Sequence, residues 1–411
     1  MRIGSTPLWS AVLFLYFPSI LMGLGQGMVI PALPLIGEAY DVPGALAAQV
    51  LTVQLLGRMI TLIPAGALID RFGVKPSMVG GALLASLSAL AAAYAPTFAI
   101  IAASQLTLGM GKSIWMFGRE LSAVDMVRRE QRGRQMSALM GISSTGMAFG
   151  PALGGVIVDA VGVRGLFLAL AAVSGIVFII SAAYRETSTR TAGERGPFFN
   201  FGAVAQIHPY FRLTYLILFF ATFAQMLRSQ VTNSMLPLYT QDELGYSATF
   251  TGMLFTLIGL TTFSMIVPTG FISDKLGRKW AAAPAAVLTT VGFVLFPVGG
   301  SVWAIVAASV LVGLANGLAM GAMTIYTYDF VPRHARAQLQ AMRRTAGELG
   351  AVMSPPVAGV AATLFSAGTS FWIFAPLHAL SAVLLVTVAR ESLQGHRRPG
   401  APTTEEIEAG R

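Results

Sequence analysis

The sequence predicts an all-α membrane protein in which 12 transmembrane helices form two pseudo-symmetric six-helix bundles. Three observations predict this fold: an apolar composition, long apolar segments, and a repeat that relates the two halves of the chain. Of the 411 residues, 55% are hydrophobic and 11% are charged, and the mean hydropathy is +0.69. Because soluble domains carry about 25% charged residues, this composition indicates a chain surrounded largely by lipid.

Twelve apolar segments are long enough to be transmembrane helices. About 20 apolar residues cross the hydrocarbon core of a bilayer as a helix, which satisfies its own backbone hydrogen bonds there. The first segment is far longer than the apolar core of a signal peptide, so we expect it to be retained. The expected spans are 8–36, 45–69, 77–94, 98–118, 136–158, 164–184, 211–236, 247–272, 280–298, 302–328, 341–365 and 370–389.

The basic residues predict the orientation of these spans. With both termini in the cytoplasm, 23 of the 27 Lys and Arg residues fall in cytoplasmic segments or at the cytoplasmic ends of spans, and one, Arg164, falls in an outer loop. Basic residues near span ends stay in the cytoplasm, so we expect cytoplasmic N- and C-termini. Since the bases lie in loops between spans, the net charge of +9 does not indicate nucleic-acid binding.

One polar ten-residue stretch occurs twice in the chain. Residues 66–75 read GALIDRFGVK, and residues 270–279, which begin 204 positions later, read GFISDKLGRK. The same offset relates other pairs: Pro64 and Pro268, Gly109 and Gly313, Asp125 and Asp329, and Gly155 and Gly359. A single offset over most of the chain indicates two six-span halves in parallel repeat. Such repeats are typical of secondary transporters, which bind substrate near the middle of the membrane between the repeats.

The repeat also sets the expected domain boundaries. The four expected segments are an N-terminal bundle at 1–184, a cytoplasmic linker loop at 185–208, a C-terminal bundle at 209–390 and a cytoplasmic tail at 391–411.

These motifs resemble those of the major facilitator superfamily. GALIDRFGVK is similar to the loop signature that follows span 2 in that superfamily, and GFISDKLGRK is similar to its second-half echo. GISSTGMAFGPALGG, at residues 141–155, resembles the span-5 motif of the bacterial drug–proton antiporters with 12 spans. The resemblance covers essentially the whole chain. It implies a secondary active transporter that works by alternating access, and the span-5 motif favours export.

The resemblance implies conformational roles for the loop motifs. Their charged and small residues would hold the two halves closed on the cytoplasmic side, whereas the alternative is that the bases only anchor the topology. The residues concerned are Gly66, Asp70, Arg71, Gly73, Lys75, Asp125, Asp274, Lys275, Gly277 and Lys279.

The span-5 motif combines small residues with a proline. Gly146, Gly150 and Gly154 are spaced four apart and share one helix face, and Pro151 and Gly155 lie beside them. Small residues at this spacing let membrane helices approach closely, and proline can bend a helix. We therefore expect a rocking surface or plain helix packing at this face, and the two roles are compatible.

Polar side chains inside the spans are the candidate substrate-cavity residues. A charge at the bilayer centre costs about 2.5–3.5 kcal/mol, so each one requires a function or a partner. In the family, spans 1, 4, 7 and 10 line the cavity. The candidates are Gln26, Arg58, Gln105, Lys112, Trp115, Arg228, Gln230 and Asn316. Because Arg228 and Gln230 lie about 200° apart around a helix, the sequence leaves open which of them faces the cavity.

Proton coupling requires a titratable group within the membrane. Drug–proton antiporters often carry an acid in span 1 and an Arg in span 4, where this chain has Gln26 and Gln105. Glu348 is the one acid expected within a span, so it is the candidate proton carrier. The alternative for Glu348 is an ion pair with Arg344, one helical turn earlier.

Three cations inside the spans, against one acid, predict a positively biased cavity that attracts anionic groups. We therefore expect a monomeric, proton-coupled exporter of an amphipathic small molecule that is anionic or lipid-like. The alternatives are a lipid or lysolipid translocator, an organic-anion importer and a non-transporting membrane sensor. The chain has no Cys and four scattered His residues, so we expect no enzyme activity, no cofactor and no metal.

Overall fold

The computed structural model describes residues 2–3, 6–7, 12–125, 132–183, 204, 206–298, 300–319, 322–332, 336–393 and 402. These residues are almost entirely helical, apart from two-residue strands β1 (Arg2–Ile3) and β2 (Thr6–Pro7), which pair antiparallel. The chain divides into two compact units. Unit 1 comprises Met1–Glu194 with Leu236–Thr256, and unit 2 comprises Arg195–Met235 with Leu257–Arg411.

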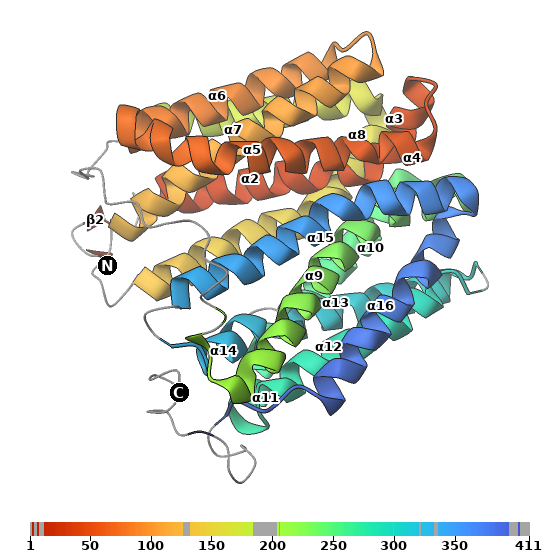
Figure 1. The fold of residues 1–411 in the computed structure, drawn as a ribbon. Helices are drawn as coiled ribbons and strands as arrows, with labels where there is room; N and C mark the ends of the chain where they lie inside the picture. The colour runs from red at the N-terminus through yellow and green to blue at the C-terminus, as the bar shows by residue number, and fades with distance from the viewer. Residues whose placement is uncertain are drawn as a thin grey trace. The chain divides into compact units, whose positions relative to one another are not determined.

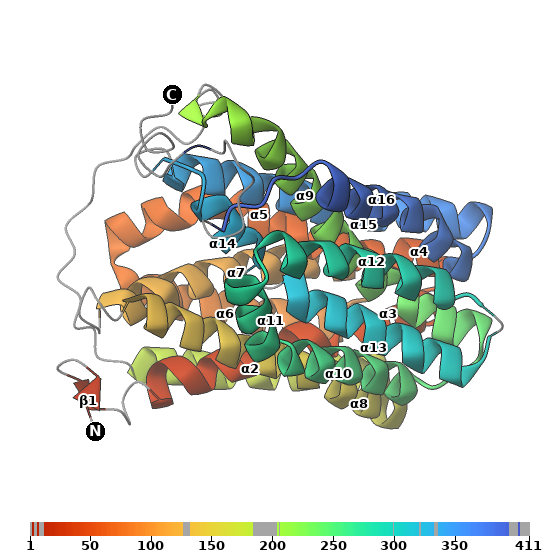
Figure 2. The same cartoon turned by 90° about the horizontal axis from the view of Figure 1, so that it is seen from below.

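Unit 1 contains most of the first predicted bundle. Its helices are η1 (Val12–Tyr16), α2 (Phe17–Met28), η2 (Ile30–Ala32), α3 (Leu33–Ala39), α4 (Gly44–Ala47), α5 (Gln49–Phe72), α6 (Val74–Ala93), α7 (Phe98–Asp125), α8 (Arg132–Ala183) and η5 (Leu238–Glu243). Helix α2 packs along α8, while α6 packs against both α7 and α8 (Figures 1 and 2). Helix α5 also packs against α7.

Unit 2 contains most of the second predicted bundle. Its helices are α9 (Pro209–Pro237), α10 (Ala248–Ser264), α11 (Ile266–Lys275), α12 (Lys279–Leu295), α13 (Val302–Ala319), α14 (Ala322–Tyr328), α15 (Arg336–Leu364) and α16 (Ala367–Thr387). The end of α9 and the first half of α10 belong to unit 1. Helix α12 is central to this unit and packs on both α13 and α16 (Figure 1). Phe293 lies edge-on to Phe371, with ring centroids 5.2 Å apart, and joins α12 to α16.

Helices α5 and α7 cross at backbone contact distance. A Cβ added at Gly57 would overlap the carbonyl oxygen of Leu106, and one added at Gly109 would overlap that of Gln54. Because glycine at both positions removes the side chain from the crossing, the polar residues of α5 and α7 next to it are brought together.

Eight helical segments in the described part of the chain are long and apolar enough to cross a membrane. One of them, Gly141–Ala183, covers two predicted spans, 136–158 and 164–184. The backbone bends between those spans at Gly162, whose φ of 71° interrupts the helical conformation inside α8. The fold is therefore the predicted all-α membrane fold, and the exact count of 12 helices stays a prediction.

Candidate functional site

A polar group lies where α5 and α7 cross in unit 1. Gln54 donates a hydrogen bond from Nε2 to Oε1 of Gln105, at 3.3 Å, and Ser113 donates to the carbonyl oxygen of the half-buried Arg58, at 3.3 Å. The close glycine crossing allows these contacts, because it brings two polar helix faces within reach of each other. The sequence-predicted residues Arg58, Gln105 and Lys112 thus belong to one helix pair.

Two buried donors of this group have no hydrogen-bond partner among the described residues. They are Nε2 of Gln105, a residue that is 1% exposed, and Nζ of Lys112. Gln105 and Lys112 are two helical turns apart and therefore share one face of α7. Buried polar groups in proteins are nearly always hydrogen-bonded, so these two donors distinguish this face of α7 from the rest of the helix pair.

Trp115 and Gln26, two further predicted cavity residues, have different surroundings. Trp115 is 2% exposed and donates from its indole nitrogen to Oγ of Ser181, at 3.1 Å. This bond ties α7 to the last turns of α8. Gln26 is exposed on α2. Trp115 therefore has a packing role in unit 1, and contact of either residue with a substrate stays a prediction.

Arg228 is a buried cation of unit 2 with neutral partners. It is 2% exposed on α9 and donates from Nη1 to Oγ1 of Thr289 on α12, at 2.8 Å. Its Nη2 donates to Oδ1 of Asn316 on α13. The nearby Gln230 is half-buried and accepts a bond from Asn233 at 3.5 Å. Arg228 thus connects three helices inside unit 2, and one of its partners, Asn316, is another of the predicted cavity residues.

Glu348, the predicted proton carrier, is half-buried on α15, and Arg344 one turn earlier is exposed. Its role in coupling therefore stays a prediction.

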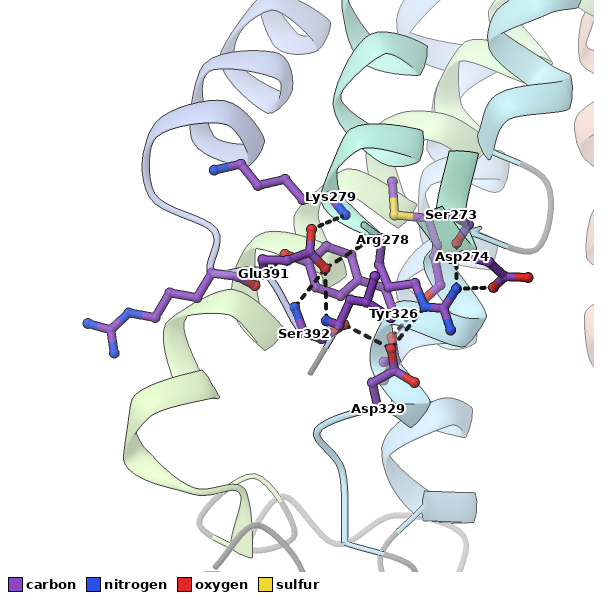
Figure 3. Close-up of polar contacts among 12 residues, drawn as sticks. Ser273, Asp274, Arg278, Lys279, Tyr326, Asp329, Glu391 and Ser392 are labelled. Carbon is purple, nitrogen blue, oxygen red and sulfur yellow. Dashed lines mark hydrogen bonds and ion pairs between the residues drawn. The ribbon is translucent and has the colours of Figure 1, made fainter. Parts of the chain in front are cut away.

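Arg278 is the centre of a charged cluster at the loop between α11 and α12 (Figure 3). Its guanidinium contacts a carboxylate oxygen of Asp274 at 2.5 Å and one of Asp329 at 3.0 Å. Burial acts to lower the pKa of Arg278, but the hydrogen bonds to Asp274 and Asp329 outweigh it, so that the pKa is raised. The cluster therefore holds a permanent positive charge between two acids.

Glu391 adds a helix cap to this cluster (Figure 3). Its two carboxylate oxygens accept bonds from the backbone nitrogens of Arg278, at 2.9 Å, and Lys279, at 3.1 Å, where α12 begins. A carboxylate at a helix N-terminus satisfies free N–H groups and the helix dipole. Gly277 makes this approach possible, because its φ is 118° and a Cβ there would overlap the carboxylate of Glu391.

Sequence reasoning predicted conformational roles for Asp274, Lys275, Gly277 and Lys279, which lie in or beside this cluster, and those roles stay a prediction; it missed Arg278 and Glu391, the central members. The 204-residue offset had pointed to Asp329. No spacing pattern marks Glu391, which follows the last helix by a few residues. The side chain of Lys275 lies over the ring of Phe271, at 6.0 Å from its centroid.

The first-half loop motif is described only in part. The side chains of Asp70 and Asp125, and the surroundings of Gly66, lie outside the described residues. Arg71 is exposed, with its guanidinium carbon 5.3 Å from the ring centroid of Phe72. Gly73 separates α5 from α6 with a φ of 91°, and Lys75 is half-buried at the start of α6. A latch formed by this motif therefore stays a prediction.

The glycines of the span-5 motif place α8 directly against α2. A Cβ at Gly146, Gly150 or Gly154 would overlap a carbonyl oxygen of α2, that of Ile20, Leu24 or Met28 respectively. The four-residue spacing therefore serves close packing inside unit 1.

A second face of the same motif contacts the first half of α10. A Cβ at Gly155 would overlap the carbonyl oxygen of Ala248, and Gly252 lies equally close to that of Pro151. Beyond the motif, a carboxylate oxygen of Asp159 accepts a bond from the backbone nitrogen of Thr249, at 2.8 Å. The motif thus joins a helix of the first repeat to a helix of the second, within unit 1.

Among the described residues, no group of three or more His, Cys, Asp or Glu side chains is placed to hold a metal ion.

Comparison with known proteins relates the chain to one large family. The family model of the Major Facilitator Superfamily matches residues 15–216 and 218–409. The tetracycline resistance protein, class H, of Pasteurella multocida is 24% identical over 370 residues, which are 88% of this chain and 90% of that protein. Multidrug resistance protein 2 of Bacillus subtilis is 22% identical over 345 residues, 82% of this chain and 85% of that protein.

Two solved structures share the fold at low sequence identity. A D-xylose-proton symporter is 14% identical, with a TM-score of 0.74, over 95% of this chain and 100% of that one. A bacterial homolog of the human lysosomal transporter Spinster is 14% identical, with a TM-score of 0.76, over 97% of this chain and 100% of that one.

Proposed function

Because the chain belongs to the Major Facilitator Superfamily, we propose that it is a proton-coupled exporter of an amphipathic small molecule with an anionic or polar head group. It is an integral membrane protein whose relatives include proteins named for tetracycline and multidrug resistance. Those relatives, together with the span-5 motif, favour export over import. The same proposal places the protein in the bacterial cytoplasmic membrane as a monomer with cytoplasmic termini, and assigns it no enzyme activity.

The observation that carries the substrate class is the pair of unpartnered donors on α7. Nζ of Lys112 and Nε2 of Gln105 are buried on one helix face without a hydrogen-bond partner among the described residues. Both groups lack an acceptor, because an ammonium and an amide N–H can only donate, and a carboxylate or phosphate oxygen would supply an acceptor together with a charge opposite to that of Lys112. Hydrogen bonds to a charged group contribute about 1.5–3 kcal/mol each, which is enough to select an anionic head over a neutral one.

Substrate binding tests this proposal directly. Purified protein is titrated with an anionic amphiphile, a lipophilic cation and a lysolipid, in the wild type and in Lys112→Gln. The anionic amphiphile should bind at least about tenfold more weakly to Lys112→Gln, which corresponds to about 1.4 kcal/mol, and Lys112→Arg should retain part of the affinity. Ser174→Ala, which changes another buried group of unit 1, is the matched control and should bind as the wild type does.

Equal binding of the anionic amphiphile by wild type and Lys112→Gln would refute the assigned substrate class. Preference for the lysolipid would instead favour a lipid translocator.

Proton coupling is tested separately in proteoliposomes. An imposed pH gradient should drive uptake of the substrate into everted vesicles, and Glu348→Gln should abolish this drive while substrate exchange without a gradient continues. Transport that is indifferent to the gradient would exclude proton coupling but leave the substrate class intact.

A further inference from the structure

We propose that a pocket at one end of unit 1 binds the zwitterionic head group of phosphatidylethanolamine. The pocket has a volume of about 780 Å³, within the range of about 300–1,000 Å³ that is typical of small-molecule sites. It lies where three turns of unit 1 meet: the turns after α3, between α6 and α7, and at the bend of α8. This end is the predicted outer face, and the pocket shares no residue with the polar group of α5 and α7.

The walls of the pocket carry charges of both signs. Glu38 and Asp41 supply carboxylates, and Arg164 supplies a guanidinium. All three side chains are exposed. No ion pair joins Arg164 to Glu38 or to Asp41, although all three residues are described and line the same pocket. Unpaired charges of opposite sign around one cavity are complementary to a ligand that itself carries both signs.

Several contacts hold these charged groups in place. The guanidinium carbon of Arg164 lies over the ring of Tyr94, 4.5 Å from its centroid, which restricts a long side chain by a cation–π contact. The hydroxyl of Tyr40 donates to the carbonyl oxygen of Ala95, at 2.8 Å, and fixes the first turn against the second. Burial raises the pKa of Tyr40, so this hydroxyl keeps its proton and remains a donor.

Asp41 has an unusual backbone conformation. Its φ is 51°, and it is the one residue other than glycine with a positive φ among the described residues. Such a conformation carries strain that tends to be retained where it positions a functional group. Here it sets the direction of a carboxylate at the pocket, one turn from Glu38.

The location and the remaining lining select a lipid over a free zwitterion. Turns between apolar helices lie near the boundary between hydrocarbon and water, where phospholipid head groups are concentrated. The pocket is also lined by apolar side chains, including Phe98, Val161 and Val163, which suit the glycerol region of a lipid. The ammonium of an ethanolamine head group has three N–H donors for the carboxylates, and the phosphate of the same head group pairs well with an Arg. A choline head group lacks these N–H donors.

Lipid binding by the full-length, delipidated protein tests this assignment. Native mass spectrometry and thermal melting are followed on addition of phosphatidylethanolamine, phosphatidylcholine or phosphatidylglycerol, with soluble phosphoethanolamine as a further arm. Phosphatidylethanolamine should bind at least about fivefold more tightly than the other two lipids and raise the melting temperature. Soluble phosphoethanolamine should bind far more weakly, because it has no acyl chains to anchor it at the pocket.

Pocket variants then locate the site. Arg164→Gln and the double variant Glu38→Gln with Asp41→Asn should each remove the preference for phosphatidylethanolamine, and Arg164→Lys should restore part of it. Asn tolerates a positive φ, so Asp41→Asn preserves the turn. Glu243→Gln, an exposed acid of unit 1 outside the pocket, is the control and should bind as the wild type does.

Equal binding of the three lipids, or an unchanged preference in the pocket variants, would overturn the proposal. Soluble phosphoethanolamine that binds as tightly as the lipid would overturn the assignment to a membrane lipid. Neither result depends on transport, so the proposed export function is tested independently.

Discussion

Lys112 and Asn316 occupy the same position of the internal repeat but have opposite surroundings. They are 204 residues apart, on α7 of unit 1 and α13 of unit 2. Lys112 is a buried cation whose Nζ has no hydrogen-bond partner among the described residues. Asn316 is a neutral acceptor that receives a bond from the buried cation Arg228. In unit 2, described residues accept hydrogen bonds from Nη1 and Nη2 of the buried cation, although its Nε has no partner among them, whereas in unit 1 Nζ of Lys112 has none.

This difference distinguishes a cation that holds helices together from a cation that is free to bind a ligand. Transfer of an ion out of water costs several kcal/mol unless hydrogen bonds and opposite charge compensate. In unit 2, Thr289 and Asn316 provide acceptors for Arg228, so its guanidinium binds three helices together. In unit 1 the described residues provide no acceptor for Nζ of Lys112, and under our proposal an anionic substrate group provides it.

The strongest test of this comparison transfers the lysine of unit 1 into unit 2. Asn316→Lys removes an acceptor of Arg228 and places a second cation beside it. Because an uncompensated buried charge costs about 3–5 kcal/mol, the variant should melt at a much lower temperature or fail to fold. Asn316→Asp, which keeps an acceptor and adds an opposite charge, should melt near or above the wild type. Equal melting of both variants would show that Arg228 does not depend on this position.

Removal of Arg228, the cation that has two hydrogen-bond partners, should have the next largest effect. Arg228→Met leaves Thr289 and Asn316 without their donor, and unsatisfied buried groups cost about 1–3 kcal/mol each. Melting in detergent should therefore show a clear loss of stability. Thr289→Val combined with Arg228→Met should cost less than the sum of the single changes, because both remove the same hydrogen bond. If the two losses of stability were strictly additive, Arg228 would not connect α9 with α12 through Thr289.

A third test concerns the close approach of Gly277 to Glu391 in the charged cluster of unit 2. Gly277→Ala places a Cβ against the carboxylate of Glu391 in a backbone conformation that disfavours side chains. We expect a loss of about 1–3 kcal/mol, as for other strained backbone positions. The loss should be smaller in a Glu391→Ala background, where only the backbone strain remains. An identical loss in both backgrounds would show that the close approach of Glu391 carries no energy.

The smallest effect on stability is expected from the reverse transfer. Lys112→Asn gives unit 1 the residue of unit 2 and removes an unpaired buried amine. Its melting temperature should equal or exceed that of the wild type, because replacing a buried charge by a neutral group is often neutral or stabilising. The affinity for an anionic amphiphile should nevertheless fall. A large loss of stability would instead indicate that Lys112 is part of the scaffold, as Arg228 is.

The sequence predicted the fold because lipid restricts it so strongly. Long apolar segments in a bilayer have few alternatives to helices, and the constant 204-residue offset reveals the two halves. The family match over residues 15–216 and 218–409 agrees with this prediction. The bend at Gly162 was not predicted in this form, because a single positive φ inside an apolar segment leaves no trace in composition.

The candidate site was predicted only as a set of residue types. Sequence periodicity places Gln105 and Lys112 on one helix face, and in the structure both residues lie on the single helix α7, two turns apart. The sequence could not predict that Gln54 donates to the side-chain oxygen of Gln105 while the amide nitrogen of Gln105 has no partner in the described part of the chain, because that depends on the glycine crossing of α5 and α7. Nor could it predict the partners of Arg228, which come from two other helices.

The sequence alone therefore determined the features that depend on local chemistry: the length of the apolar segments, the helix periodicity, and the duplicated motifs with their charges. The tertiary structure decided which of these charges are satisfied. Arg228 and Arg278 have acceptors on distant segments, whereas Nζ of Lys112 has none among the described residues. The reason is physical, since a hydrogen bond depends on positions within about 3 Å, and residues far apart in sequence reach that distance only when the helices have packed.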